Sequence, residues 1–162
     1  MAANTTDRSP IARKLDVAIY DEAPIATSAT VYCGNLVNFN AAGRLVDATA
    51  ATSRRFAGML VEILNDSGAI VSAGTGNTGG TVKGKFRFNC EELLDVKTGM
   101  RTTTNLGKIV YVSDNHTIDG TAVGTALVRV NVGAIAQFIG ASDKTQAWVH
   151  LRHLSTTDAA TG

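Results

Sequence analysis

The sequence has few cysteines, prolines and aromatic residues, and it has no long apolar run. Its 162 residues include two cysteines, two prolines and one tryptophan, and aromatic residues make up 6% of the chain. No stretch approaches the roughly 18 consecutive apolar residues of a membrane-spanning helix. Residues 1–10 are polar, without the apolar centre of a signal peptide. We therefore expect no membrane insertion, and we expect Cys33 and Cys90 to be free thiols, with a disulfide between them as the less favoured alternative.

A strong net charge is also missing. Fifteen Lys and Arg residues oppose fourteen Asp and Glu residues, which gives a formal net charge of +1. Broad nucleic-acid binding needs a basic face that neutralises phosphates, so we expect no nucleic-acid partner. Hydrophobic residues make up 44% of the chain, enough for one globular domain that buries roughly 70% of its unfolded surface.

Nucleotide-binding motifs are present only in incomplete form. Gly74–Gly79 matches the G-x-G-x-x-G pattern, but the sequence TVKGKFRF that follows it is typical of a strand, whereas the motif needs a helix there. Gly79–Lys85 matches G-x-x-x-x-G-K, but Phe86 stands where magnesium binding needs Ser or Thr. We therefore predict a glycine-rich hairpin loop and no nucleotide cofactor.

Metal and catalytic motifs are absent as well. His150 and His153 have an odd spacing, which places them on opposite faces of a regular strand. His116 lies between Asp114 and Asp119, but the segment lacks the ligand spacing of a calcium loop, so these residues are predicted to belong to a turn. Neither G-x-S-x-G nor H-E-x-x-H occurs. We expect no metal site and no enzyme, although a catalytic pair assembled from distant residues stays an open alternative.

Short strand patterns are what the chain does contain, and they are most regular from Leu106 to Leu151. Apolar and β-branched residues at 109–112, 134–139 and 146–152 alternate with turn residues, and 125–132 is also strand-like. This patterning predicts an all-β fold.

The middle of the chain continues the β pattern. Residues 35–46 predict a hairpin with Gly43 in its turn, and Phe56–Leu64 predicts a strand buried on both faces. From Val82 to Cys90 apolar residues alternate with the basic stripe Lys83, Lys85 and Arg87. The stripe is predicted to be a solvated strand face, and binding to an acidic protein surface is the alternative. Glu91 and Glu92 are expected on the surface, and residues 91–104 are compatible with a helical turn, a strand or an ordered loop.

The N-terminal segment is predicted to be an extended arm. Residues 1–14 are small and polar, and Leu15–Tyr20 alternates as a strand that pairs either within its own domain or with a neighbouring sheet. We accordingly divide the chain into an arm with an edge strand at 1–20, a β domain at 21–154 and a flexible tail at 155–162.

Several segments, taken in order, resemble the head decoration proteins of tailed bacteriophages. They are GNLVNFNAAGRLVDATA, RFAGMLVEILND, GGTVKGKFRF, LGKIVYVSDNHTI, VGAIAQFIG and AWVHL. The resemblance covers residues 31–151 and rests on hydrophobic and turn patterns. It implies a small β-barrel or β-sandwich with an N-terminal arm. It also implies a non-enzymatic cement protein on the capsid exterior of the virion, which binds the major capsid protein as a homotrimer.

Contacts with the capsid or with neighbouring subunits are expected from apolar residues of the arm, from two adjacent arginines and from the single tryptophan. These residues are Ile11, Leu15, Val17, Tyr20, Arg54, Arg55 and Trp148. Two other functions remain open: a head–tail or fibre-associated virion domain, and a carbohydrate-binding β-sandwich that uses Trp148 as a stacking platform. The low aromatic content disfavours the second.

Overall fold

The computed structural model describes residues 11–49, 54–120, 131–140 and 143–152. The fold is mostly β, with 55% strand and no helix of seven or more residues, which confirms the predicted all-β class. In this part of the chain no helix has the length and apolarity needed to cross a membrane. Cys33 and Cys90 are free thiols, as predicted.

Fourteen strands and three short 3-10 helices make up the described structure. The strands are β1 (Ala12–Arg13), β2 (Ile19–Pro24), β3 (Thr30–Tyr32), β4 (Leu36–Phe39), β5 (Leu45–Asp47), β6 (Arg55–Leu64), β7 (Ile70–Val71), β8 (Ala73–Thr75), β9 (Lys83–Phe88), β10 (Glu91–Val96), β11 (Ile109–Val112), β12 (Thr117–Asp119), β13 (Asn131–Ile139) and β14 (Gln146–Leu151). The 3-10 helices are η1 (Leu15–Val17), η2 (Thr98–Met100) and η3 (Thr103–Asn105). Residues 125–130 of the predicted strand-like stretch and His153 lie outside the described residues.

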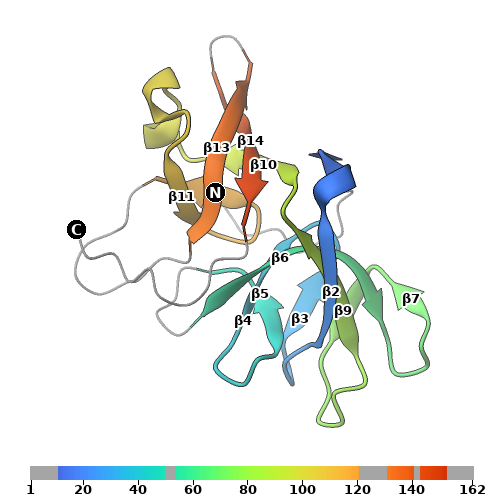
Figure 1. Ribbon diagram of the computed structural model, residues 1–162. Coiled ribbons are helices and arrows are strands. Elements are labelled where there is room, and N and C mark those ends of the chain that lie inside the picture. Colours follow the sequence, from blue (N-terminus) through green and yellow to red (C-terminus); the bar gives the residue numbers. More distant parts are fainter. Residues whose placement is uncertain (1–10, 50–53, 121–130, 141–142, 153–162) are drawn as a thin grey trace.

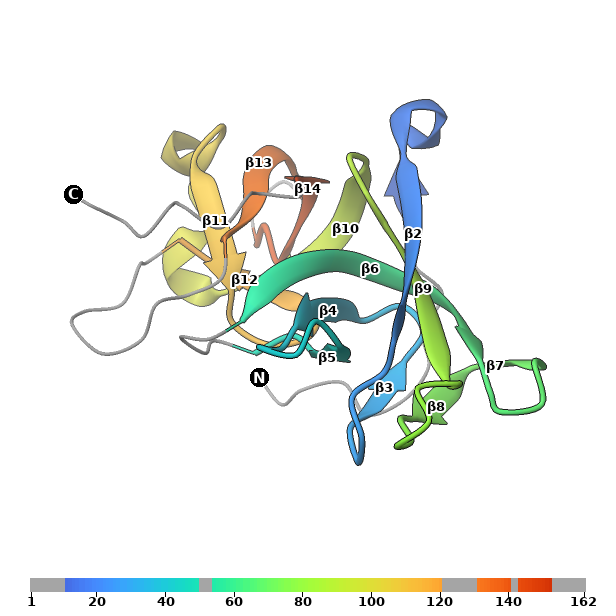
Figure 2. The same ribbon diagram turned by 60° about the horizontal axis from the view of Figure 1, so that its bottom comes forward.

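The first sheet has the order β2-β9-β6-β4-β5, with antiparallel neighbours and β7 added to β6. Its two edges meet just after β2. Ile25 forms a parallel bridge with Leu45, and the Ala26 amide donates to the Leu45 carbonyl at 2.8 Å. The sheet thereby closes into a small barrel, and the β3–β8 pair lies beside it (Figure 2).

The second sheet also closes on itself. Its order is β10-β12-β11-β13-β14, and β14 pairs back onto β10. β1 pairs with the start of β10, on the edge that β12 uses further along the strand. In Figure 1 this sheet forms the upper half of the molecule, from yellow to red, above the blue-to-green first sheet. The chain therefore builds two closed sheets, joined where β9 runs into β10.

Strand β6 belongs to the first sheet but contributes side chains to the hydrophobic cores of both sheets. Its Phe56 and Met59 pack in the core of the second sheet, whereas Ala57, Leu60 and Ile63 pack in the core of the first. The strand arches between the two halves in Figure 2. The burial on both faces that its continuous apolar sequence predicted is confirmed.

The hairpin of β4 and β5 is confirmed too. Gly43 adopts φ +72°, a left-handed conformation that costs glycine little. The Asn40 side-chain oxygen accepts the Ala42 and Arg44 amides at 3.0 Å each, which fixes the turn.

The prediction of one strand over Leu15–Tyr20 is wrong. The chain first pairs with β10 through β1, turns at Lys14 with φ +56°, forms η1 and only then enters β2. It must change direction because β1 belongs to the second sheet and β2 to the first. β2 pairs with β9 of the same chain, which is the first of the two pairings that the sequence left open. Residues 91–104 combine a strand, β10, with the helical turns η2 and η3.

Candidate interaction surface

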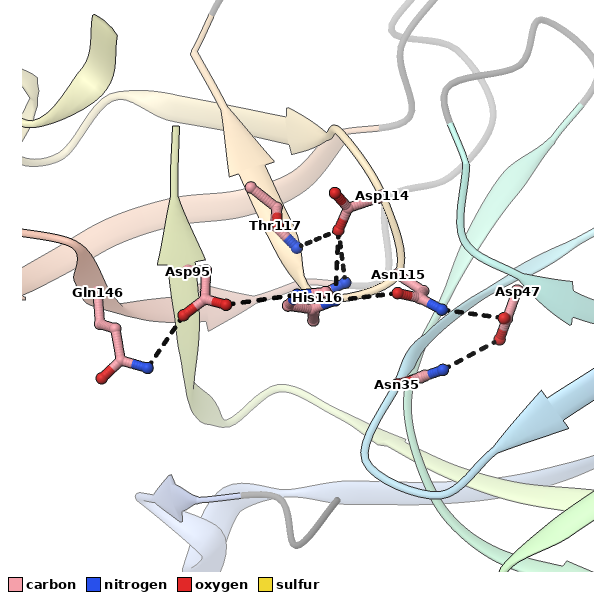
Figure 3. Close-up of polar contacts among 8 residues, drawn as sticks. All are labelled: Asn35, Asp47, Asp95, Asp114, Asn115, His116, Thr117 and Gln146. Atoms are coloured by element: carbon pink, nitrogen blue, oxygen red, sulfur yellow. Dashed lines mark hydrogen bonds and ion pairs between the residues drawn. The ribbon is translucent and has the colours of Figure 1, made fainter. Parts of the chain in front are cut away.

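A cluster of polar side chains lies at the junction of the two sheets and includes His116 (Figure 3). The His116 ring is buried, with Nδ1 3.0 Å from Asn115 Oδ1 and 3.4 Å from Asp114 Oδ1, and Nε2 3.4 Å from Asp95 Oδ2. Asp114 Oδ1 also accepts the backbone amides of His116 and Thr117, at 3.1 and 2.9 Å. This is the geometry of a side-chain-capped turn, as the sequence predicted.

The cluster continues across the junction to the first sheet. Asn115 Nδ2 donates to Asp47 Oδ2 at 3.0 Å, and Asn35 Nδ2 donates to the other oxygen at 3.5 Å. Burial raises the pKa of Asp47, although these amides and Arg54 oppose the shift. The residues face one another from both sheets in Figure 3, so the cluster is a seam that holds the sheets together. Among the described residues, no group of three or more His, Cys, Asp or Glu side chains is arranged to hold a metal ion.

The glycine-rich motif contains a loop, but the prediction of a hairpin is wrong. Gly74 lies in β8, which pairs with β3, whereas β9, which follows the loop, pairs with β2 and β6. β9 stands where a nucleotide site would need a helix. A Cβ on Gly76 would lie 2.1 Å from the Ala26 carbonyl oxygen, so glycine permits close backbone packing here.

The predicted surface positions of Arg87, Glu91 and Glu92 are wrong. All three are buried, and Arg87 Nε donates to Glu92 Oε1 at 2.5 Å. The outward face of β9 meets the start of the second sheet at this point, so alternation along β9 does not lead to solvent. Of the predicted basic stripe, Lys83 is exposed and Lys85 is half-buried, 3.5 Å from Glu62.

The ionisable groups where β9 runs into β10 have pKa values shifted in different directions. Burial raises the pKa of Glu92 despite the bonds from Arg87, and it raises the pKa of the Cys90 thiol to about 12, with Glu92 adding to that shift. Burial also opposes ionisation of Glu91, but the hydrogen bonds from Lys14 and Arg13 outweigh it and lower the pKa of that carboxyl.

These bonds fasten the N-terminal segment to the second sheet. Arg13 and Lys14 both bind the buried carboxylate of Glu91, and Arg13 Nη1 donates to Gln137 Oε1 at 2.8 Å. The Arg13 guanidinium also lies over the Trp148 ring, 4.5 Å from its centroid. Trp148 is half-buried beneath it.

The segment fastened in this way carries most of the exposed large apolar residues. Residues 11–22, which we call the N-terminal ridge, contain five of the nine such residues in the described chain, each between 42% and 57% exposed. They are Ile11, Leu15, Val17, Ile19 and Tyr20. Large apolar side chains gathered on one exposed segment are typical of an interaction surface.

The ridge is held rigidly at its other end as well. Asn89 Nδ2 donates to the Val17 carbonyl at 2.8 Å, and the Lys85 ammonium lies 5.6 Å from the centroid of the Tyr20 ring. A partner would therefore meet a preformed surface, with little ordering cost on this side.

The open edge of β2 is poorly suited to strand addition. Ile25 donates toward β9, to Val82, whereas Ala26 donates away from it, to Leu45. Because neighbouring residues alternate, Glu22 and Pro24 also face away from β9. The Asp21 carboxylate already accepts the Glu22 amide at 2.8 Å, and Pro24 has no amide hydrogen. Contacts at the ridge therefore rely on side chains.

The structure brings together some of the predicted contact residues. The four apolar ones, Ile11, Leu15, Val17 and Tyr20, share the ridge, and Trp148 joins them through Arg13. Two others lie apart, at the start of β6: Arg54 Nη1 donates to the Asp47 carbonyl at 2.9 Å, and the Arg55 guanidinium is 5.8 Å from the centroid of the Phe39 ring.

Sequence reasoning missed two kinds of residue at this surface. Ile19, Asp21 and Glu22 extend the ridge beyond the predicted contacts, and their exposure on both faces of β2 has no signal in the alternation of the sequence. Glu91 was missed because it resembles a surface acid. Adjacent Arg13 and Lys14 offered the only hint of an acidic partner.

No protein family, no curated protein and no solved structure matches this chain.

Proposed function

We propose that the protein is a structural virion component that binds the exterior of a tailed-phage capsid and stabilises the lattice of the major capsid protein. The observation that carries this proposal is the N-terminal ridge, a preformed segment rich in exposed apolar side chains that is fastened to a rigid β body. The order of strand and turn patterns that resembles decoration proteins supports the same function.

The physical basis of such a role is repetition. Each copy makes a modest contact through the ridge, either with the shell protein or with a neighbouring copy. Many copies attached to one closed shell resist its expansion, because several contacts must break together. This role requires a rigid scaffold and matching surfaces, and it needs neither a cofactor nor a metal.

The ridge makes the proposal testable by substitution. Ile19→Ser and Leu15→Ser remove apolar area that is exposed in the free protein, so we expect wild-type folding and about tenfold weaker co-sedimentation with empty capsids of the cognate phage. Ile70→Ser is the matched control, since Ile70 is 67% exposed but lies on β7.

The outcome separates this function from the alternatives. Equal binding of the ridge variants and the control would contradict a role for the ridge. Labelling at a single vertex of the particle would instead favour a head–tail or fibre-associated domain. Glycan binding that is lost in Trp148→Ala would favour a carbohydrate-binding module, but the Arg13 guanidinium already lies over that ring.

A further inference from the structure

We propose that copies of this protein associate head to tail, with the N-terminal ridge of one copy seated on a basic apolar patch of the next. The patch is formed by Leu106, Lys108 and Ile109. This inference rests on the proposed function, in which many copies act together on one shell, and it assigns the ridge to a second copy of the chain.

The patch has the composition that the ridge requires. Leu106 and Ile109 are 47% and 51% exposed, and Lys108 is exposed between them. Within the described part of the chain no carboxylate forms an ion pair with Lys108. An apolar surface with an unneutralised cation fits a partner that offers apolar side chains and a carboxylate.

The ridge supplies both. Its apolar residues run directly into Asp21 and Glu22, which are exposed and form no ion pair with a Lys or Arg of the described residues. Lys85, the cross-strand neighbour of Glu22, lies 3.5 Å from Glu62 instead. The two surfaces therefore match in apolar character and are opposite in charge, so that the charges set the register of the contact.

The patch is as firmly held as the ridge. The Gly107 amide donates to the Ile135 carbonyl at 2.8 Å, the Ile135 amide donates to the Lys108 carbonyl at 3.2 Å, and the Lys108 amide donates to the Asn105 carbonyl at 3.2 Å. The inward neighbour Val110 is fully buried, which fixes Ile109 on the outer face of β11. Two preformed surfaces can dock with little ordering cost.

The ridge and the patch lie too far apart for a two-fold symmetric dimer in which the ridge of each copy contacts the patch of the other. Figures 1 and 2 place η1 and β2 on one side of the second sheet and η3 with the start of β11 on the opposite side. A ridge-to-patch contact between copies is therefore heterologous, and each copy offers one ridge and one patch. Such contacts close into a ring when the rotation per copy allows it.

The test is a charge exchange measured by light scattering and sedimentation velocity on the purified full chain. We expect the wild-type protein to self-associate at concentrations up to about 0.1 mM, a range in which a specific interface is populated. Glu22→Lys and Lys108→Glu each place like charges across the contact and weaken association about tenfold. The double variant restores opposite charges and brings association back to within about threefold of the wild type.

Controls and contrary outcomes are as follows. Asp143→Lys and Lys83→Glu make the same charge changes at other exposed positions and leave association unchanged. Ile109→Ser weakens association without altering charge, and Ile139→Ser on β13 does not. Ile109→Ser also tests the contact should Glu22→Lys disturb folding beside Lys85.

A monomer at every concentration overturns the inference, and so does self-association that neither charge exchange nor Ile109→Ser affects. Binding to empty capsids reports separately on the proposed function. A monomer that co-sediments with capsids overturns only the head-to-tail contact, whereas an oligomer that fails to co-sediment overturns the function.

Discussion

At the residue scale, Glu91 and Glu92 are adjacent and both buried, yet they bind different partners and their pKa values shift in opposite directions. Glu92 faces Arg87 across the corner between the two sheets, and Glu91 receives Arg13 and Lys14 from the N-terminal ridge. The pKa of Glu91 is lowered, so its bonds stabilise the fold above the ordinary value of 4.5, and this stability is lost as the pH falls through the lowered pKa. The pKa of Glu92 is raised, so the contribution of this residue to the stability of the fold is lost as the pH rises through the raised pKa.

Glu91→Gln separates the two contributions. We expect the substitution to reduce the free energy of unfolding by about 1–2 kcal/mol at about pH 6, because two cations lose their carboxylate partner. The difference from the wild type shrinks as the pH falls through the lowered pKa of Glu91, because the wild-type carboxylate then becomes protonated. Urea unfolding at about pH 6 and at a series of lower pH values measures it. Glu62→Gln, which removes a half-exposed partner of Lys85, changes the free energy of unfolding by less than about 0.5 kcal/mol. An equal loss in both variants would contradict the stabilising role of the contacts that Arg13 and Lys14 make with Glu91.

The two cysteines also differ at this scale. The Cys90 thiol is fully buried with a pKa raised to about 12, whereas Cys33 is half-buried. Because the thiolate is the reactive form, we expect a thiol reagent at about pH 8 to modify Cys33 in the folded protein and Cys90 only after unfolding. Counting modified thiols with and without denaturant measures this. A Cys33→Ser variant that still reacts at the wild-type rate while folded would contradict it.

At the element scale, the seam between β5 and the β11–β12 turn couples the two closed sheets. Asn115→Ala leaves the half-buried Asp47 carboxylate without its donor at 3.0 Å, so we expect the free energy of unfolding to fall by about 1–2 kcal/mol. Asn115→Asp keeps the shape but sets two carboxylates together, so we expect a larger loss at neutral pH that lessens as the pH is lowered. Thermal unfolding of both variants measures the effect. Unfolding temperatures equal to that of the wild type in both variants would show that the seam does not stabilise the fold.

Individual strands were the part of the fold that the sequence predicted well. β6 and the β4–β5 hairpin carry local signals, a continuous apolar run and a turn glycine, and both were predicted. Alternation along β9 correctly separated its two faces but did not reveal what lies beyond each face. The outward face meets the second sheet at Arg87, and closure of the two sheets depends on long-range pairs such as Ile25 with Leu45.

The candidate surface was predictable to a similar extent. The apolar residues of the predicted arm and its edge strand marked Ile11, Leu15, Val17 and Tyr20 as contacts, and the structure leaves all four exposed. The acids that follow them and the patch at Leu106–Ile109 depend on which side chains remain free after folding. A single sequence does not encode that information locally.

At the scale of the whole molecule, β6 contributes side chains to the cores of both closed sheets, and the seam and the Arg87–Glu92 pair also join the two sheets. The ridge and the basic apolar patch lie on opposite sides of this body (Figure 1). A rigid unit with two distant contact surfaces is suited to transmitting force across a shell, which links the proposed association to the proposed function.

The most direct test of that function is saturable binding of the 162-residue chain to empty capsids that lack it, measured by co-sedimentation and followed by heating of the loaded shells. We predict a fixed number of copies per shell, distributed over its surface, and rupture of loaded shells at a higher temperature than bare ones. Absence of binding, or binding that leaves the rupture temperature unchanged, would contradict the proposed function.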